Sequence, residues 1–312
     1  MTWLITGGAG YIGSHVVRAL DSAGHLTVVF DDLSTGKKSR VPANVPLVVG
    51  SILDGDLVAS TMREHGITGV VHLAAKKSVA ESVENPELYE LTNVVGTETI
   101  LAAAHASGVK YFVNSSSASV YGESGIARVS ESDPAIPASP YGATKLAAEG
   151  IVDRYRALGM ATCSLRYFNV AGSVAVELRD DSVANLFPIV LRNIEQHERP
   201  KIFGNDYETP DGTCVRDYVH VRDIAEAHVI AAEMLMTSDL PPVLNIGTGR
   251  GSSVLEVVRT LLDLTKSSLE PEFVARRSGD VGELVADVTL ARKVLGVNFT
   301  SDVPEIAASL IN

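Results

Sequence analysis

The N-terminal half of the chain alternates short apolar runs with stretches in which apolar residues recur at helical spacing. Several of the apolar runs lack the period-two alternation of a strand with one wet face, so they predict strands buried on both faces. The expected strands are Trp3–Thr6, Thr27–Asp31, Leu47–Ile52, Gly69–Leu73, Lys110–Ser115 and Thr162–Phe168. The expected helices between them are Tyr11–Ser22, Gly55–Glu64, Pro86–Ala106 and Pro140–Leu158. This order predicts an α/β fold with a doubly wound parallel sheet that is covered by helices on both faces.

The pattern changes after Asn169. A loop-like stretch over residues 172–183 and a polar, glycine-containing stretch over residues 203–212 interrupt the alternation. The elements expected beyond Asn169 are helices at 185–196, 224–236 and 253–264 and a strand at 243–246. We interpret the second of these helices and the strand as one more unit that returns to the first sheet. The expected domains are residues 1–169 plus about 219–247, and a smaller, discontinuous α/β domain of about 170–218 plus 248–312.

Charge and composition narrow the function. Acidic side chains outnumber basic ones by 38 to 26, the net charge is −12, and no run of Lys and Arg exceeds two residues. A surface for nucleic acid or for an anionic membrane is therefore not expected, because both are bound mainly through basic patches. Cys163 and Cys214 form neither a disulfide framework nor a metal-type pair, and no metal site is expected. No apolar run approaches the roughly 18 residues of a membrane span and no signal-peptide pattern is visible, so the expected location is the cytoplasm.

A glycine-rich loop predicts a nucleotide site. Gly-Gly-Ala-Gly-Tyr-Ile-Gly at 7–13 follows the first expected strand and opens the first expected helix. Such glycines permit a tight turn, close approach to a pyrophosphate and close helix–strand packing, and the helix N-terminus favours the anion. Asp31 and Asp32 end the second strand, where a carboxylate accepts hydrogen bonds from a ribose and repels a 2′-phosphate. The pattern predicts a Rossmann-type site that prefers NAD to NADP, although three basic residues follow closely and glycines also make ordinary turns.

A Tyr–Lys pair predicts acid/base chemistry. Tyr141 and Lys145 are four residues apart near the start of an expected helix and so share one helix face. An ammonium near a phenol favours the phenolate and lowers the phenol pKa, which produces a group that exchanges a proton with a sugar hydroxyl or a carbonyl. The Ser-rich run at 115–119 ends an expected strand, at the sheet edge where α/β proteins bind ligands. Taken alone, the pair also arises by chance and the Ser run also fits an ordinary turn.

Longer segments extend these motifs. They are Thr-Gly-Gly-Ala-Gly-Tyr-Ile-Gly-Ser-His at 6–15, Ser-Ser-Ser-Ala-Ser-Val-Tyr-Gly at 115–122, Ser-Pro-Tyr-Gly-Ala-Thr-Lys at 139–145, Leu-Arg-Tyr-Phe-Asn at 165–169, Ile-Phe-Gly-Asn-Asp-Tyr at 202–207 and Asp-Gly-Thr-Cys-Val-Arg-Asp-Tyr-Val-His-Val at 211–221. Together they resemble the extended short-chain dehydrogenase/reductase family, and within it the UDP-hexose 4-epimerases of the UDP-galactose 4-epimerase type. The resemblance runs over nearly the whole chain.

The resemblance implies roles for individual residues. Tyr141 is the implied acid/base, Lys145 holds the nicotinamide ribose and tunes Tyr141, and Ser117 positions the sugar O4. The implied cofactor is NAD, bound by Gly7, Gly10, Tyr11, Ile12, Gly13, Asp31, Asp32, Leu33, Ser34, Thr35, Gly36, Ser51, Ile52, Leu73, Ala74, Ala75, Lys77, Asn93, Ser115, Tyr141, Lys145 and Phe168. The implied UDP-sugar site consists of Lys77, Ser117, Tyr141, Asn169, Asn185, Leu186, Lys201, Ile202, Phe203, Arg216, Arg277, Asp280 and Leu284. The implied reaction inverts C4 of a UDP-hexose through a transient 4-keto sugar, in a homodimer formed through the helices at 86–106 and 140–158.

Two other kinds of function stay open. Related dehydratases carry an Asp-Glu pair directly after the catalytic Ser or Thr, and nucleotide-sugar decarboxylases carry a Glu two residues after it. This chain has Ala118 and Ser119 at those positions, so elimination chemistry lacks its acid. A non-catalytic NAD-sensing relative is the other alternative, and the intact set of Ser117, Tyr141 and Lys145 argues against it.

The substrate is less certain than the reaction. Ser51 replaces the acidic residue that the family usually has beside the adenine, and Leu284 stands where enzymes for UDP-glucose and UDP-galactose have a bulky Tyr, which leaves room for an N-acetylated hexose. Arg192 follows Asn185 by seven residues, so it returns to the same helix face if Asn185 caps the helix. An Arg there would bind a C6 carboxylate, which makes UDP-glucuronate and UDP-galacturonate substrate candidates. The alternative is a solvated surface Arg.

Overall fold

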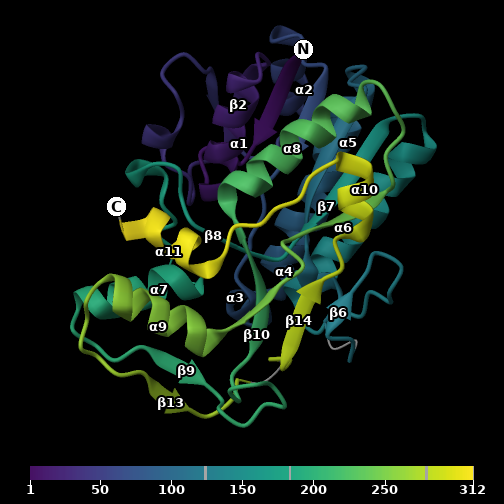
Figure 1. Cartoon of the computed structure of the whole chain (residues 1–312). Helices are drawn as coiled ribbons and strands as arrows, with labels where there is room; N and C mark the ends of the chain where they lie inside the picture. Colours follow the sequence, from purple (N-terminus) through teal and green to yellow (C-terminus); the bar gives the residue numbers. More distant parts are fainter. Residues whose placement is uncertain (123–124, 183, 278–279, 312) are drawn as a thin grey trace.

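The structure is a computed structural model that describes residues 1–122, 125–182, 184–277 and 280–311 (Figure 1). Its larger part is a parallel sheet of seven strands in the order β11-β7-β5-β4-β1-β2-β3. The strands are β1 (Thr2–Thr6), β2 (Leu26–Asp31), β3 (Leu47–Val49), β4 (Gly69–His72), β5 (Tyr111–Ser117), β7 (Ala161–Tyr167) and β11 (Val243–Ile246). The expected doubly wound parallel sheet is confirmed. The strand expected at 243–246 returns to this sheet as predicted, because β11 pairs with β7.

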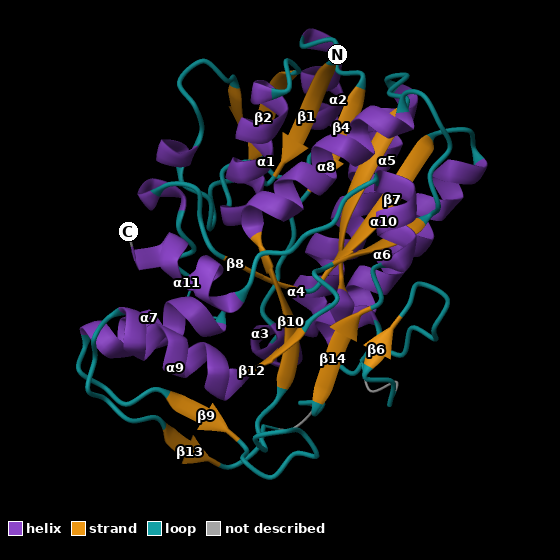
Figure 2. Ribbon diagram, in the orientation of Figure 1, coloured by secondary structure: helices purple, strands orange, loops and turns teal. Residues whose placement is uncertain are grey.

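Helices cover both faces of this sheet, because each presents one apolar side to it (Figure 2). On one face, α1 (Tyr11–Ser22) and α8 (Val221–Leu235) share an apolar core with the strands. On the other face, a second core contains residues of α2 (Gly55–Glu64), α5 (Gly96–Ala106) and α6 (Pro140–Ala157). The sequence places α1 and α2 at their observed bounds, whereas α8 begins three residues earlier than expected because His220 accepts a hydrogen bond from the Arg222 N–H as its N-cap.

The helix expected at 86–106 is not one continuous α-helix. It divides into α4 (Pro86–Tyr89), a π-helical turn η2 (Glu90–Val95) and α5. Within η2, Asn93 directs its side chain to the loop after β4 instead of to solvent. A short helix that the sequence did not predict, α3 (Val79–Glu84), lies before α4 and begins where the Ser78 hydroxyl accepts from the Glu81 N–H.

The smaller part contains a second, mixed sheet and its own apolar core. The strands of that sheet are β6 (Arg128–Val129), β8 (Asn169–Ala171), β10 (Val215–His220), β12 (Gly251–Ser253) and β14 (Glu283–Ala286). The smaller part also holds a separate two-stranded sheet of β9 (Lys201–Phe203) and β13 (Glu272–Val274). Its helices are α7 (Leu186–Glu195), α9 (Val254–Leu264) and α11 (Val303–Ile311), while α10 (Thr289–Leu295) packs near β11 and α8. One half of β10 pairs with β12 and β14 and the other half pairs with β8, so β10 links the segment after β7 to the C-terminal strands.

The strands of this part were not predicted. Most of them have two to four residues, too few to show a period, and the six-residue β10 was missed as well. The helices expected at 185–196 and 253–264 are confirmed as α7 and α9. Across the described residues, no helix combines the length and apolar character that a membrane span requires.

Candidate active site

The glycine loop forms a close turn between β1 and α1. Gly7 has φ +71°, in the left-handed region that favours glycine. A Cβ on Gly13 would lie 2.1 Å from the Gly7 carbonyl oxygen, so a side chain there would push the helix away from the strand. Gly10 precedes α1 as its N-cap and supplies no side-chain cap, which leaves the first N–H groups of the helix without a side-chain acceptor. The loop therefore fits a pyrophosphate, which needs close backbone approach and N–H donors.

The carboxylate of Asp31 is buried at the end of β2. Its Oδ2 accepts from the Ala9 N–H at 2.9 Å and its Oδ1 accepts from the Leu33 N–H at 2.9 Å, so it ties the glycine loop to the next turn. Burial raises its pKa. Each carboxylate oxygen accepts more than one hydrogen bond, which leaves room for ribose hydroxyls. Asp32 differs: it is exposed and its Oδ1 accepts from the Ser34 N–H at 2.8 Å.

The remaining residues of the expected cofactor site border these loops. The half-buried Leu73, Ala74 and Ala75 follow β4, the turn of Thr35 and Gly36 follows β2, and Ser51 and Ile52 follow β3, with Ser51 exposed and Ile52 buried. Asn93 is buried, and its amide is engaged by the Lys76 backbone and by the Thr144 hydroxyl. It therefore shapes the loop after β4 rather than presenting a free amide.

The structure brings the three expected catalytic residues together. Ser139 caps α6 by accepting from the Gly142 N–H at 3.1 Å, so Tyr141 and Lys145 lie in the first two turns of the helix. Ser117 ends β5, and its side chain hydrogen-bonds the Tyr141 phenol. Lys145 is buried, and its Nζ donates to the Ser115 carbonyl at 2.8 Å. Thus the phenol, the ammonium and two serines of β5 meet at the carboxyl end of the large sheet.

One electrostatic expectation is wrong for this structure. Burial raises the pKa of Tyr141, and the hydrogen bond from Ser117 opposes this only in part. Burial also lowers the pKa of Lys145 to about 8, and the Lys145 ammonium is not among the groups that shift the phenol. Desolvation disfavours the charged form of both side chains, and here it outweighs the attraction between ammonium and phenolate.

The expected diphosphate residues also lie together, in the smaller part. Arg216 on β10 pairs with Leu284 on β14 in strand register, and an Nη2 of Arg216 lies 4.0 Å from Oδ1 of Asp280. The Arg277 guanidinium lies 3.7 Å from the centre of the Phe203 ring. The Asp280 N–H donates to the Arg277 carbonyl, so two cations, an aromatic ring and an acceptor lie together in the smaller part, an arrangement suited to a nucleoside diphosphate.

Other expected substrate residues are placed differently. Asn185 was expected to cap α7. It stands at the N-cap position, but its amide donates to Asp180 and makes no cap hydrogen bond, so the expectation is right for the position and wrong for the contact. Ile202 is buried in the core of the smaller part, which leaves only its backbone for a ligand, whereas Asn169 and Lys201 are exposed. Arg192 is exposed in the last turn of α7. The adjacent face of α7 packs in the core, as its periodicity predicted.

Sequence reasoning predicted a loop over residues 172–183 but missed the contacts that its described residues make with the glycine-loop side. The Tyr11 hydroxyl donates to the Gly172 carbonyl at 2.6 Å, and the buried Arg40 donates from Nη2 to Asp181 at 3.0 Å. The ammonium of Lys77 lies 3.7 Å from a carboxylate oxygen of Asp180. Acidic residues in a loop do not reveal their partners more than 100 positions away, so only the tertiary structure shows these ties.

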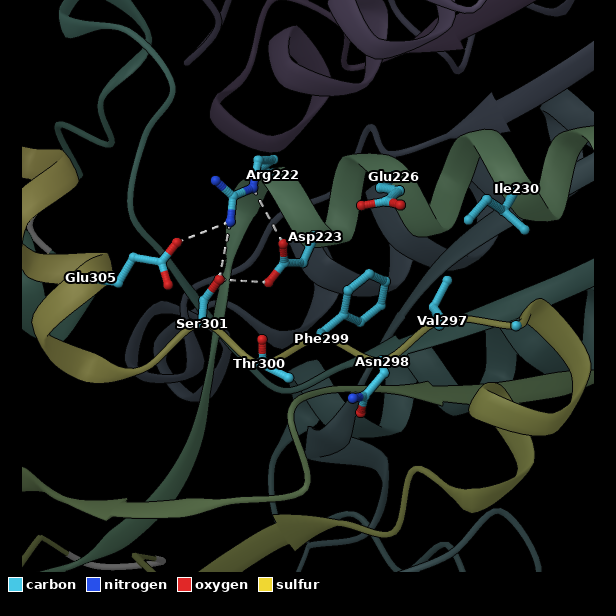
Figure 3. A pocket seen from close by; sticks show the side chains of 11 residues that line it. Arg222, Asp223, Glu226, Ile230, Val297, Asn298, Phe299, Thr300, Ser301 and Glu305 are labelled. Carbon is cyan, nitrogen blue, oxygen red and sulfur yellow. Dashed lines mark hydrogen bonds and ion pairs between the residues drawn. The ribbon is translucent and has the colours of Figure 1, made fainter.

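A cavity of about 370 Å³ lies away from these residues, between α8 and the segment that leads into α11 (Figure 3). Arg222 donates to Glu305 and to Ser301, and Ser301 donates in turn to the buried carboxylate of Asp223. These contacts pair the charges of Arg222, Asp223 and Glu305 with one another across the cavity wall. We therefore interpret this cavity as part of the contact between α8 and the C-terminal segment, and not as a ligand site.

Comparisons with known proteins agree with this geometry. Residues 3–247 match the model of the NAD dependent epimerase/dehydratase family. A curated UDP-glucose 4-epimerase of Azospirillum brasilense is 42% identical over 298 residues, covering 94% of this chain and 86% of that protein. The solved UDP-glucose-4-epimerase of Stenotrophomonas maltophila, with bound NAD and formylated UDP-arabinopyranose, superposes with a TM-score of 0.94 at 36% identity and covers 99% of this chain and 96% of that one. The UDP-glucose 4-epimerase of Brucella ovis in complex with NAD gives a TM-score of 0.93 at 39% identity, with the same coverage.

The matched family model spans most of the chain, and the relatives cover nearly all of it. Both the resemblance and the cofactor are thereby confirmed: the chain belongs to the NAD dependent epimerase/dehydratase family.

Proposed function

We propose that this protein is an NAD-dependent UDP-glucose 4-epimerase. The observation that carries the proposal is the meeting of Tyr141, Ser117 and Lys145 at the carboxyl end of β5, beside the glycine loop. The relatives named as UDP-glucose 4-epimerases support the choice of reaction. Ala118 and Ser119 offer no carboxylic acid beside Ser117, which disfavours the dehydratase and decarboxylase alternatives.

In the proposed reaction, Tyr141 accepts the proton of the sugar O4 as C4 becomes a carbonyl, and returns it after the keto sugar has presented its other face. When bound, NAD would take up the hydride of C4 and later return it to C4, so the sugar undergoes no net oxidation. Ser117 holds O4 next to the phenol. The charged Lys145 favours the phenolate, which must form against the effect of burial.

In this proposal each part of the molecule binds one of the two ligands. Residues 1–169 and about 219–247 form the NAD domain, and about 170–218 with 248–312 form the UDP-sugar domain. Arg216 and Arg277 bind the diphosphate and Phe203 contacts the uridine side. Firm binding of UDP at one end leaves the hexose free to turn over at the other.

A charged hexose is a second substrate candidate. Arg192 is exposed, and the ion pairs found among the described residues do not include it, so its guanidinium is free to reach a C6 carboxylate if the sugar extends toward the end of α7. The half-buried Leu284 beside Arg216 supports a pocket with space for a larger hexose.

We also propose a homodimer. Leu91 and Val95 are 46% and 45% exposed on η2, and the small residues Ala143 and Ala147 are exposed on the neighbouring α6. A second copy of this chain would bury these side chains in a helical interface. Both cysteines are buried and unpaired, which fits the proposed location in the reducing cytoplasm.

Replacing Tyr141 with Phe tests the reaction. We expect kcat for conversion of UDP-glucose to UDP-galactose to fall by about 10³-fold, because the proton acceptor is lost. Tyr89→Phe is the matched control, since its ring lies edge-on to Tyr141 at 6.4 Å but its hydroxyl bonds Glu81 and the Ser78 N–H. Near-normal turnover by Tyr141→Phe would refute the assignment.

Replacing Asp31 with Asn tests the NAD site. We expect the NAD dissociation constant to rise by roughly 10- to 100-fold, because the ribose loses a charged acceptor and the loop loses two charge-assisted bonds. Asp32→Asn, one residue further and exposed, should change it little. Titration calorimetry on NAD-free protein gives both values, and equal effects of the two variants would contradict the prediction.

Replacing Arg192 with Ala tests the substrate. If Arg192 binds a C6 carboxylate, kcat/KM for UDP-glucuronate falls by roughly 10- to 100-fold while that for UDP-glucose stays the same. The C4 epimers are separated by chromatography. Equal loss on both substrates, or loss on neither, would remove the charged-hexose proposal.

Replacing Leu91 with Asp tests the dimer. An exposed charge is tolerated in a monomer but not in an apolar interface, so we expect light scattering to report a monomer for Leu91→Asp and a dimer for the parent. Leu26→Asp is a suitable control, because Leu26 is 69% exposed at the start of β2, outside the helices of the proposed interface. A monomeric parent would refute the proposal.

A further inference from the structure

The buried face of α6 carries a third ionisable residue. Glu149 follows Lys145 by four residues, as Lys145 follows Tyr141, so the three side chains form one row along the helix. Only 4% of Glu149 is exposed. An unpaired carboxylate at that depth would be strongly destabilising, so its partners define what it does.

The Glu149 carboxylate joins α6 to two strands. Oε1 accepts from the Ser116 hydroxyl on β5 at 2.5 Å and from Arg166 Nε on β7 at 2.9 Å. Oε2 accepts from Arg166 Nη2 at 2.6 Å, which makes the pair bidentate. Arg166 also donates to the Tyr121 hydroxyl at 2.9 Å, so the network continues behind the site.

Ser116 stands between the two serines that touch the catalytic pair. The Ser115 carbonyl accepts from Lys145, and the Ser117 side chain bonds Tyr141. Fixing the Ser116 side chain therefore fixes the end of β5 relative to α6. A buried ion pair is weak evidence for stability alone, because its desolvation offsets much of its attraction. Its position beside Lys145 points to a role in the site.

We propose that Glu149 is a positioning residue for the reaction: it fixes the end of β5 through Ser116 and keeps the buried Lys145 ammonium charged. The effect of Glu149 on catalysis rests on the proposed function, whereas its effect on the charge of Lys145 does not. Glu149 raises the pKa of Lys145 against the effect of burial. Lys145 acts in its charged form. Without the negative charge of Glu149, Lys145 loses its proton at a lower pH, so activity falls at a lower pH on the alkaline side of the pH profile.

Other ionisable groups surround this row. His72 on β4 lies near Lys145, and burial lowers the pKa of its imidazole to about 3, so it is neutral. Tyr167 and Arg166 approach from β7, and Cys163 on the same strand lies near Glu149. On α6 itself the additional charges are Asp153, one turn beyond Glu149 and exposed, and Arg154 and Arg156 in the last turn. Among the residues that the structure describes, Glu149 is the negative group that raises the pKa of Lys145.

The test is a direct titration of Lys145. Protein labelled with ¹³C at the lysine Cε carbons is followed by NMR as the pH is raised, with the Lys145 signal assigned from a Lys145→Arg sample. We expect an apparent pKa near 8 in the parent and a value lower by roughly one unit in Glu149→Gln. Asp153→Asn removes a carboxylate from the next turn of the same helix and should leave the titration unmoved.

Glu149→Gln leaves Arg166 without its charge partner, so Glu149→Gln/Arg166→Gln, which buries no unpaired charge, is measured beside it. The double variant should shift the Lys145 pKa in the same direction but by less, because the positive charge of Arg166 is removed together with the negative charge of Glu149. If only one of these two variants folds, that variant is the test. An unchanged Lys145 pKa in the folded variant would overturn the proposal.

Ser116→Ala separates positioning from charge. It breaks the tie between Glu149 and β5 without removing a charge, so we expect kcat to fall about tenfold with unchanged KM and an unmoved Lys145 titration. Unchanged kcat would overturn the positioning role. Since the titration needs no turnover, failure of the parent to convert UDP-glucose would count against the proposed function and not against the charge role of Glu149.

Discussion

The candidate site depends on the packing of one face of α6 against the carboxyl end of β5. Tyr141, Lys145 and Glu149 place a phenol, an ammonium and a carboxylate in a row with little access to water. Each must find its partner among the serines of β5 or in Arg166, so the polar contacts hold helix and strand in one register. The desolvation that enforces this register also sets the acid–base properties, by raising the pKa of the phenol and lowering that of the ammonium.

The two parts of the molecule are joined on either side of that centre. β10 belongs to the second sheet, yet its far half pairs with the strand that follows β7. Tyr11, at the start of α1, reaches across to the Gly172 carbonyl, and Arg40 reaches Asp181. The glycine loop is thereby held in a fixed relation to the segment that leads into α7. Two ligands, a dinucleotide in one part and a nucleoside diphosphate in the other, need such a fixed relation for their reacting groups to meet.

The chemistry of the two ends differs in kind. At the glycine loop the backbone provides the N–H groups, and the absence of side chains at Gly7 and Gly13 is what permits the turn. At the end of the second sheet, side chains provide the recognition, because Arg277 stacks on Phe203 and Arg216 faces Asp280. In a chain of net charge −12, two cations gathered at one place mark an anion site more clearly than they would in a basic protein.

The sequence by itself determined the large sheet, because long apolar runs and helical periods are local signals; α1 and α2 were predicted at their observed bounds. It also predicted Tyr141 and Lys145 as an acid/base pair, since they share a helix face, and the family resemblance added Ser117. Only the tertiary structure decided the π-helical turn around Asn93, the short strands of the smaller part and the ties between Lys77 and Asp180. It also reversed the expected pKa shift of Tyr141 and showed that Glu149 faces the site. The reason is that burial and long-range pairing depend on which distant segments meet, and spacing along the chain carries no record of either.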